Sequence, residues 1–410
     1  MTSQPLPTMF DLTPLNESYR ADPHAILDDL RTRCPVHHDE TSGNFILTRY
    51  ADVRKLVADR AMWRNPGRAG ETAHQTRRQV ESHVDGFSST ETTSILFLDD
   101  PDHQRIRRPL NRAFYARIAG LRPSVERIVD ETLDRIDPAA PFDLMAAFCL
   151  PIPIDAIASI LGVDRSMLND FRTWSEGVIH SLNPYRTAEQ TAEMQRCDAV
   201  LSAYFTAAIA ARQAAPDDDL ISDMTRLQSG GTQVSDAELR INLSALLIGG
   251  NLTTTDLIGN AARLLILNPG ELAKLRSDPS LIASAVEETL RYEPPVDITG
   301  RITPAEMEIG GVAVSPAQNL TLCLRAANRD PEAFEDPHAF VIDRRREPHM
   351  AFGGGAHICI GAPLARLEAQ VALAKLFERF PNLKLANPDG TPEWRTLPFF
   401  RGLERLMVAA

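Results

Sequence analysis

The sequence predicts a mainly helical fold with a smaller β-rich region. Apolar residues recur at helical spacing along most of the 410 residues, and the chain has no internal repeat or long low-complexity tract. A largely apolar run from Leu239 to Leu267 indicates a long buried helix. Gly310 and Gly311 lie between two short runs typical of strands and indicate a hairpin.

The long helix has clear start and stop signals. Ser235 and Glu238 form a capping box at its start, and the Asn-Pro-Gly sequence at 268–270 ends it. Gly249 and Gly250 interrupt its middle, and each costs about 1 kcal/mol relative to alanine. We therefore expect the helix to cross the centre of the molecule and a bound group to lie against its glycines.

Shorter elements follow the same rules. A strand is expected near Phe45 to Tyr50. A helix is expected to begin after the cap Asp278, with Pro279 in its first turn, and to end at Pro294. Two polar segments, 65–93 and 215–236, are expected to be loops, and the first is long enough to be a lid or binding loop.

Composition and charge exclude several classes of protein. The net charge of -12 argues against general binding to nucleic acids or anionic membranes. The N-terminus has neither a signal-peptide pattern nor the roughly 18 apolar residues that span a bilayer. The five cysteines are odd in number and scattered, so a disulfide framework and a structural zinc site are not expected. We expect a cytoplasmic protein without a membrane anchor.

The stretch "FGGGAHICIG", from Phe352 to Gly361, carries the strongest chemical signal. Its glycines let the backbone approach a bulky group and let amide groups point at the Cys359 sulfur, as a metal-bound thiolate requires. Phe352 would exclude solvent from that sulfur. The stretch lacks the Gly-Lys-Ser/Thr ending of a phosphate loop, and its glycines are misplaced for a dinucleotide site. A cysteine nucleophile beside His357 and a structural cysteine remain as alternatives.

This stretch resembles the haem-binding loop of the cytochrome P-450 family, whose pattern is Phe-Gly-x-Gly-x-His/Arg-x-Cys-x-Gly. The resemblance implies that Cys359 is the axial ligand of the iron in haem b, with Phe352, Gly353 and Gly361 at the fixed positions around it. It extends from about residue 22 to the C-terminus and implies one domain over 1–410, with 1–21 as an extended segment and no fused reductase. The haem would lie between the long central helix and the cysteine loop.

Other residues match the family in the expected order. Glu288 and Arg291 resemble its Glu-x-x-Arg helix, and Arg344 matches the arginine that completes the structural triad bracing the cysteine loop. Alone, such a pair is usually a solvated surface pair. Four more residues resemble side chains that hold the haem propionates: His103, Arg107, Arg301 and His357. Asp100 and Pro101 are expected to begin the helix that carries the first two.

The central helix matches the family's oxygen-activating pattern at every position but one. The resemblance implies that the hydroxyl of Thr253 donates a hydrogen bond to oxygen bound at the iron, although such a threonine often bonds back to the carbonyl four residues earlier. Leu252 stands where most relatives carry an acid. Water held by Asn251 and Thr253 is our preferred proton route. The alternatives are Asp256, one turn beyond Leu252, or chemistry that depends less on the acid, such as the use of peroxide.

The resemblance implies a haem-thiolate monooxygenase that hydroxylates or oxidatively dealkylates a hydrophobic small molecule with O2. Electrons would come from a ferredoxin or flavodoxin and its NAD(P)H-dependent reductase, docked with the help of Arg105, Arg108 and Arg112. A haem protein that binds gas or transfers electrons without oxygenating a substrate is the alternative class, and a cysteine hydrolase is a third. By family position, the substrate pocket is lined by Ile95, Leu246, Gly249, Gly250, Val296, Ile298 and Phe399.

Overall fold

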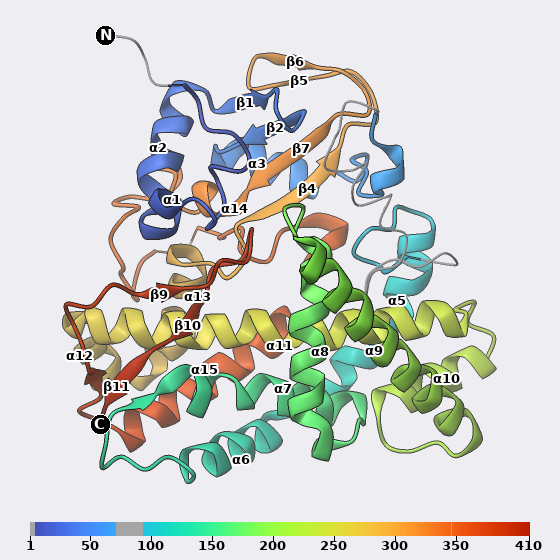
Figure 1. Ribbon diagram of the computed structural model, residues 1–410, viewed down its shortest axis with the longest axis vertical. Coiled ribbons are helices and arrows are strands. Elements are labelled where there is room, and N and C mark those ends of the chain that lie inside the picture. The colour runs from blue at the N-terminus through green and yellow to red at the C-terminus, as the bar shows by residue number, and fades with distance from the viewer. Residues whose placement is uncertain (1–4, 71–92, 346) are drawn as a thin grey trace. The chain divides into compact units, whose positions relative to one another are not determined.

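The computed structural model of the protein describes residues 5–70, 93–345 and 347–410 (Figure 1). The chain forms two compact units. The first unit comprises Met1–Glu81, Gly270–Cys359 and Trp394–Gly402, and the second comprises Ser82–Pro269, Ile360–Glu393 and Leu403–Ala410. Helices dominate and strands are short, which confirms the predicted fold class.

The first unit is built on a four-stranded sheet with the order β1-β2-β7-β4. Strands β2 and β7 are parallel, and the other two pairs are antiparallel. The predicted hairpin at Gly310 and Gly311 is confirmed: both have positive φ angles, 56° and 83°, and join β5 to β6. The strands are β1 (Val36–Asp39), β2 (Asn44–Leu47), β4 (Ile298–Ile302), β5 (Met307–Ile309), β6 (Val312–Val314) and β7 (Asn319–Cys323).

The rest of the first unit contains short helices, which come before, between and after these strands in the sequence. They are α1 (Glu17–Ala21), α2 (Pro23–Arg33), α3 (Tyr50–Ala58), η1 (Pro66–Arg68), η5 (Pro279–Leu281), α13 (Ile282–Tyr292), α14 (Leu324–Ala327) and η6 (Gly355–His357). Helix α12 (Pro269–Ser277) starts at the junction of the units. The strand predicted near Phe45 is shorter than expected, because Tyr50 already begins α3. The N-terminal segment is not simply extended, since Asn16 caps α1 and Tyr19 is buried.

The second unit is almost entirely helical. Its helices are α5 (Asp102–Ala119), α6 (Arg122–Leu133), η2 (Met145–Cys149), α7 (Pro151–Leu161), η3 (Arg165–Met167), α8 (Leu168–Val178), η4 (Ile179–Leu182), α9 (Ala188–Ala214), α10 (Leu220–Ser229), α11 (Asp236–Leu267) and α15 (Ala362–Arg379). The three short strands β3 (Phe142–Asp143), β11 (Met407–Ala409) and β8 (Lys384–Leu385) form a sheet. The strands β9 (Glu393–Trp394) and β10 (Leu403–Arg405) fall where the chain passes between the units.

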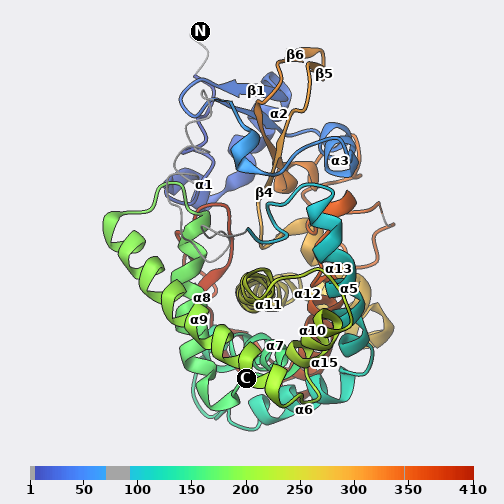
Figure 2. The same ribbon diagram turned by 90° about the vertical axis from the view of Figure 1, so that its right-hand side faces the viewer.

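Helix α11 is the long helix that the sequence predicts. Ser235 and Glu238 form the capping box, and the helix spans 32 residues before Asn268. It packs against α7, α8, α9 and α15, and Figure 2 views it nearly along its axis with these helices around it. A Cβ atom at Gly259 would lie 2.4 Å from the sulfur of Met145, so only glycine permits that contact. The helix therefore forms the core of its unit.

Two local predictions were wrong. The segment 215–236 was expected to be a loop, but it contains α10, which Asp219 caps by accepting a hydrogen bond from the Ser222 amide. Asp100 does not cap α5; its carboxylate accepts a hydrogen bond from the side chain of Gln104 instead. Most of the segment 65–93 lies outside the described residues. Within the described ranges, no helix is both long enough and apolar enough to cross a bilayer.

Candidate active site

The cysteine loop ends in an accessible thiol. Gly353 and Gly355 both have φ angles of 65°, a left-handed conformation that favours glycine, and the Cys359 amide donates to the carbonyl of Phe352 at 3.0 Å. Cys359 is exposed, whereas the other four cysteines are buried or half-buried. The loop therefore turns sharply and presents one thiol.

Helix α3 explains why the loop needs its glycines. A Cβ atom at Gly355 would lie 2.5 Å from the carbonyl oxygen of Val57, and one at Gly354 would lie 2.8 Å from a methyl group of the same valine. Arg301, predicted to serve a propionate, also contacts this residue: its guanidinium donates to the Val57 carbonyl at 3.0 Å and is almost fully buried. The cysteine loop and Arg301 therefore both pack against Val57 of α3.

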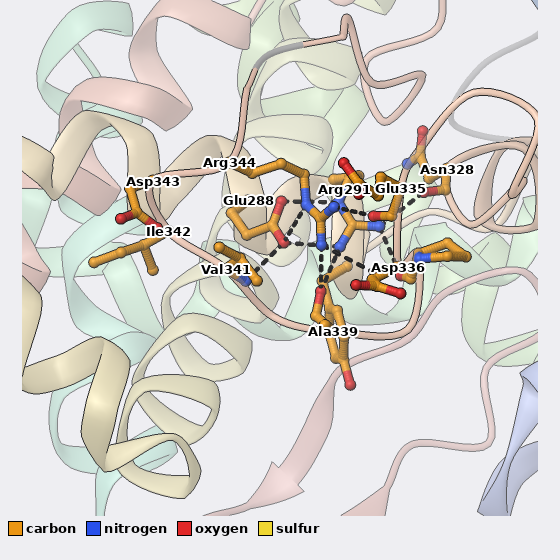
Figure 3. Close-up of polar contacts among 12 residues, drawn as sticks. Glu288, Arg291, Asn328, Glu335, Asp336, Ala339, Val341, Ile342, Asp343 and Arg344 are labelled. Carbon is orange, nitrogen blue, oxygen red and sulfur yellow. Dashed lines mark hydrogen bonds and ion pairs between the residues drawn. The ribbon is translucent and has the colours of Figure 1, made fainter.

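The three residues predicted to form the structural triad lie in contact (Figure 3). Arg291 donates from Nε and Nη2 to the two oxygens of Glu288, each at 2.8 Å. Arg344 donates to Glu288 Oε1 at 3.2 Å, and the Val341 amide donates to the same oxygen at 2.9 Å. Both Glu288 and Arg291 are buried, so their charges are compensated by each other rather than by water.

The same arginines hold the segment that precedes the cysteine loop. Arg291 and Arg344 both donate to the Ala339 carbonyl at 2.9 Å, and Arg291 also donates to the carbonyl of Asn328 at 3.0 Å. The side chain of Asn328 in turn accepts a hydrogen bond from the Met350 amide at 2.6 Å. A continuous set of hydrogen bonds therefore leads from α13 to the start of the loop.

In the second unit, α5 carries two of the predicted propionate ligands. His103 and Arg107 are one turn apart and are 2% and 8% exposed. The Nδ1 atom of His103 lies 3.6 Å from a carboxylate oxygen of Asp100. A cationic side chain that is this deeply buried needs an anionic or hydrogen-bonding partner, which suits a carboxylate. His357, predicted for the same task, is half-buried in η6 of the first unit.

The two adjacent glycines of α11, Gly249 and Gly250, have different surroundings. Gly249 is exposed and a Cβ atom there would meet nothing within 4 Å, whereas one at Gly250 would lie 3.3 Å from the side chain of Ile157 in α7. Only Gly249 therefore leaves open space beside the helix. Gly250 is explained by close packing of α11 on α7 instead.

Thr253 adopts the helical back-bond. Its hydroxyl donates to the Gly249 carbonyl at 2.8 Å, so the proton of the hydroxyl is directed into the helix and the oxygen can accept a hydrogen bond. This geometry differs from the expected donor role. The alternative weighed from the sequence, a bond to the carbonyl four residues earlier, is what the structure contains.

The neighbours of Thr253 are buried. Asn251 is 2% exposed, and its side-chain oxygen accepts no hydrogen bond from any described residue. Leu252 is 6% exposed and Asp256 is completely buried, so the Asp256 carboxylate has no direct contact with solvent. Both side chains considered for proton transfer are thus buried, and their exposure does not distinguish them.

Several buried acids lie outside the motifs of the sequence, and Glu368 is one of them. Glu368, on α15, is completely buried, and neither carboxylate oxygen has a hydrogen-bond partner within the described ranges. Burial raises the pKa of Glu368 well above its usual value. The available signal was its spacing, because Leu364 and Ala372 lie one turn to either side and are also buried.

The predicted pocket residues divide between the units. In the second unit, Ile95 and Leu246 are buried, and the Ile95 amide donates to the side chain of Asn242 in α11 at 2.9 Å. In the first unit, Val296 and Ile298 are half-buried. Phe399 is buried and has a φ angle of 68°, which is unusual for a residue with a side chain. All of these side chains are apolar.

The donor set fits a haem. Among the described residues, no group of three or more His, Cys, Asp or Glu side chains is arranged to hold a metal ion. A single accessible cysteine suits a metal whose remaining ligands come from a macrocycle. The buried His103 and Arg107 and the open space beside Gly249 suit the carboxylates and the flat face of such a group.

Comparison with known proteins identifies the family. The family model described as "Cytochrome P450" matches residues 70–395, and the chain is 38% identical to "Cytochrome P450 107B1" of Saccharopolyspora erythraea over 97% of each chain. It is 33% identical to "Cytochrome P450 monooxygenase PikC" of Streptomyces venezuelae, covering 98% of this chain and 94% of the relative. The solved structure of Mycobacterium smegmatis CYP164A2 with econazole bound superimposes with a TM-score of 0.87, at 32% identity over 97% and 98% of the two chains.

The chain belongs to the cytochrome P450 family. It is an oxidoreductase of the monooxygenase type, with a haem iron as its cofactor. Such enzymes require O2 and electrons from a redox partner, and they act on organic substrates. These findings confirm the resemblance that the cysteine loop carries.

Proposed function

We propose that the protein inserts one atom of O2 into a hydrophobic small organic molecule, by hydroxylation or oxidative dealkylation, in the cytoplasm. Electrons would come from a separate ferredoxin or flavodoxin with its NAD(P)H-dependent reductase. The single observation that carries the proposal is the accessible Cys359 thiol at the end of the glycine turn. Bound haem b would supply the oxygen-activating chemistry, with Cys359 as its axial ligand.

The chain's own residues would hold this group and move protons. His103, Arg107, Arg301 and His357 are proposed to bind its carboxylates. Thr253 directs its hydroxyl proton to Gly249, so its oxygen is available to accept a hydrogen bond from water. The unpartnered side-chain oxygen of Asn251 is available to hold a second water molecule. We infer that these two residues keep water in place for proton transfer, since Leu252 cannot carry a proton.

The substrate is proposed to be hydrophobic because the predicted pocket residues are apolar. Ile95, Leu246, Val296, Ile298 and Phe399 offer no charge to a ligand. A relative's structure with bound econazole, a bulky apolar imidazole, supports a site of this character. We therefore expect the natural substrate to be recognised by its shape and apolar surface.

The test uses the full chain with haem bound. The reduced protein with carbon monoxide is expected to give the thiolate-type spectrum, and Cys359→Ser is expected to lose it, while the control Cys34→Ser keeps it. A screen for compounds that shift the haem spin state, followed by product analysis with 18O2, NAD(P)H and a surrogate redox system, then tests oxygen insertion. A thiolate spectrum in Cys359→Ser, or oxidised products without 18O, would contradict the proposal.

Use of peroxide is a second candidate, favoured by Leu252 at the position of the usual acid. The same substrates would be incubated with hydrogen peroxide in place of O2, NAD(P)H and the redox system. Faster product formation with peroxide would favour this route, and faster formation with the redox system would favour the first.

A further inference from the structure

The first unit contains a fully buried group of charged side chains, which we name the charge cluster: Glu293, Asp297, Arg325 and Arg401. Arg325 is 0% exposed, and the other three are at most 8% exposed. Two cations and two anions balance one another, so the cluster is neutral. Burying four charges is costly unless each is closely paired, so the contacts within the cluster are strongly fixed.

Arg325 lies at the centre of the charge cluster. Its guanidinium donates to Asp297 Oδ1 at 2.5 Å, to Glu293 Oε1 and to the carbonyl of Pro294 at 2.7 Å. Arg401 donates to the same Glu293 oxygen at 3.0 Å. Burial raises the pKa of Glu293, but the charges of Arg325 and Arg401 outweigh it and lower the pKa to about 2. Both carboxylates are held by arginines.

The charge cluster is joined directly to two segments proposed to line the substrate pocket. The backbone amide of Asp297 donates to the Phe399 carbonyl at 2.9 Å, and the amide of Arg401 donates to the carbonyl of Pro295 at 2.9 Å. Val296 and Phe400 form a β-bridge between these hydrogen bonds. Members of the cluster therefore hold the two segments together with their backbones as well as with their side chains.

Phe399 needs such support because its backbone is strained. Its φ angle of 68° lies in the left-handed region, which a residue with a large side chain rarely adopts. Strained backbone of this kind persists where the surroundings fix it, and it is concentrated at functional sites. The hydrogen bond from Asp297 to Phe399 is one of the contacts that fix it.

Tyr19, from helix α1, completes the charge cluster from a distant part of the sequence. Its ring is 1% exposed, and its hydroxyl donates to Asp297 Oδ2 at 3.1 Å. The guanidinium of Arg401 also reaches α1, donating to the Arg20 carbonyl at 2.8 Å. Asp297 thus binds Tyr19 through one carboxylate oxygen, Arg325 through the other and Phe399 through its amide.

We propose that Tyr19 is a positioning residue for substrate binding, which acts through Asp297 to hold Phe399 in its strained conformation. This inference rests on the proposed function, in which Phe399 lines the pocket. Without the Tyr19 hydroxyl, one oxygen of the buried Asp297 carboxylate loses its donor, and the side chain turns towards Arg325. The amide of the same residue moves with it, and the hydrogen bond to Phe399 weakens.

Two azole ligands distinguish a change in the pocket wall from a change at the haem itself. Econazole and imidazole both bind through a ring nitrogen and are followed by the shift of the haem spectrum, but only econazole is large enough to contact pocket walls. Tyr19→Phe in the full haem-bound chain is expected to weaken econazole binding by roughly 3- to 10-fold and to leave imidazole binding unchanged. Tyr50→Phe is the control, because it removes another buried hydroxyl that bonds to a different segment, at the Pro348 carbonyl.

A double-mutant cycle tests whether Tyr19 acts through Phe399. Tyr19→Phe is expected to have no further effect on econazole binding in the Phe399→Ala background. Equal econazole affinity in Tyr19→Phe and wild type, an equal loss in Tyr50→Phe, or a full loss in the Phe399→Ala background would each overturn the inference. Failure of the proposed function would differ from all of these, since no compound would then give an 18O-labelled product while the azole shifts would remain.

Discussion

Three buried polar side chains differ in their hydrogen bonding: Glu288 of the first unit, and Asn251 and Glu368 of the second. In the first unit, Glu288 accepts hydrogen bonds from Arg291, Arg344 and the Val341 amide. In the second unit, the side-chain oxygen of Asn251 and both oxygens of Glu368 accept none from the described residues. Satisfied networks make a structure rigid, whereas buried polar atoms without protein partners are costly and suggest a functional use. Glu288 therefore fixes the segment before the cysteine loop, whereas the side-chain oxygen of Asn251, close to Thr253 in the sequence of α11, is available to water or a ligand.

The largest expected effect comes from breaking the satisfied network. Glu288→Gln removes the charge that compensates the buried Arg291, so the free energy of unfolding is expected to fall by about 3 to 5 kcal/mol. Denaturant unfolding of the haem-bound protein and the rate of haem loss measure the effect. Glu126→Gln, which breaks an exposed pair with Arg122, is the control and should change stability by less than about 0.5 kcal/mol. Equal stabilities of the two variants would show that the network does not brace the loop.

The next effect concerns the polar atoms of α11. Asn251→Ala removes the available acceptor beside Thr253, so the product formed per NAD(P)H consumed is expected to fall by about tenfold. Asp256→Ala is expected to lower this ratio less, because the proposed water route runs through Asn251 and Thr253 and does not include Asp256. The measurement compares NAD(P)H consumption, product and released peroxide for both variants. Equal or reversed effects would exclude the proposed water route through Asn251.

The sequence predicted the features that depend on local rules or on fixed motif spacing. The capping box at Ser235 and the hairpin at Gly310 are set by neighbouring residues, and both were confirmed. The spacing of Glu288 and Arg291 also anticipated an ion pair that the structure contains. What the sequence could not predict depends on tertiary contacts. Nothing local shows that Gly250 packs on Ile157.

The hydrogen bond that the Thr253 hydroxyl donates could not be predicted from the sequence, for a different reason. A helical threonine can donate to the preceding turn or to a bound group, and the residue type is the same in both cases. The helix α10 was missed because its polar residues are also typical of loops, and its capping by Asp219 is recognised only once its buried face is known. Glu368 belongs to no motif, and its burial depends on how α15 packs in the folded chain.

The protonation of Glu368 is expected to make the stability of the folded protein depend on pH. Burial raises the pKa of Glu368, so the folded protein keeps a proton that the unfolded chain releases above about pH 4.5. Stability conferred by this proton is complete below that pH and is lost as the pH rises towards the folded-state pKa. Glu368→Gln keeps the shape without the titration, so its stability relative to wild type is expected to increase as the pH rises from 5 to 8.

Unfolding curves of both proteins at the two pH values measure this difference. Glu378→Gln, at an exposed position on the same helix, is the control and should show no such pH dependence. If the relative stability of Glu368→Gln stays constant with pH, the carboxyl group is already satisfied in the folded protein. Glu368 would then resemble Glu288, and of these three side chains Asn251 alone would have an oxygen without a partner among the described residues.

The smallest expected effect concerns electron delivery along α5. Arg105 pairs with Glu238 and Arg108 bonds to Gln104, so Arg112, which is exposed, is the arginine of this set left to dock an acidic partner. Arg112→Glu is expected to slow reduction of the haem by a ferredoxin about two- to fivefold at low ionic strength, with the difference fading as salt screens the charges. Arg127→Glu on α6 is the control, and econazole affinity should be unchanged in both variants. A rate that is equal in Arg112→Glu and Arg127→Glu would mean that the donor approaches another face, and the arginines of α5 would then serve only to anchor that helix.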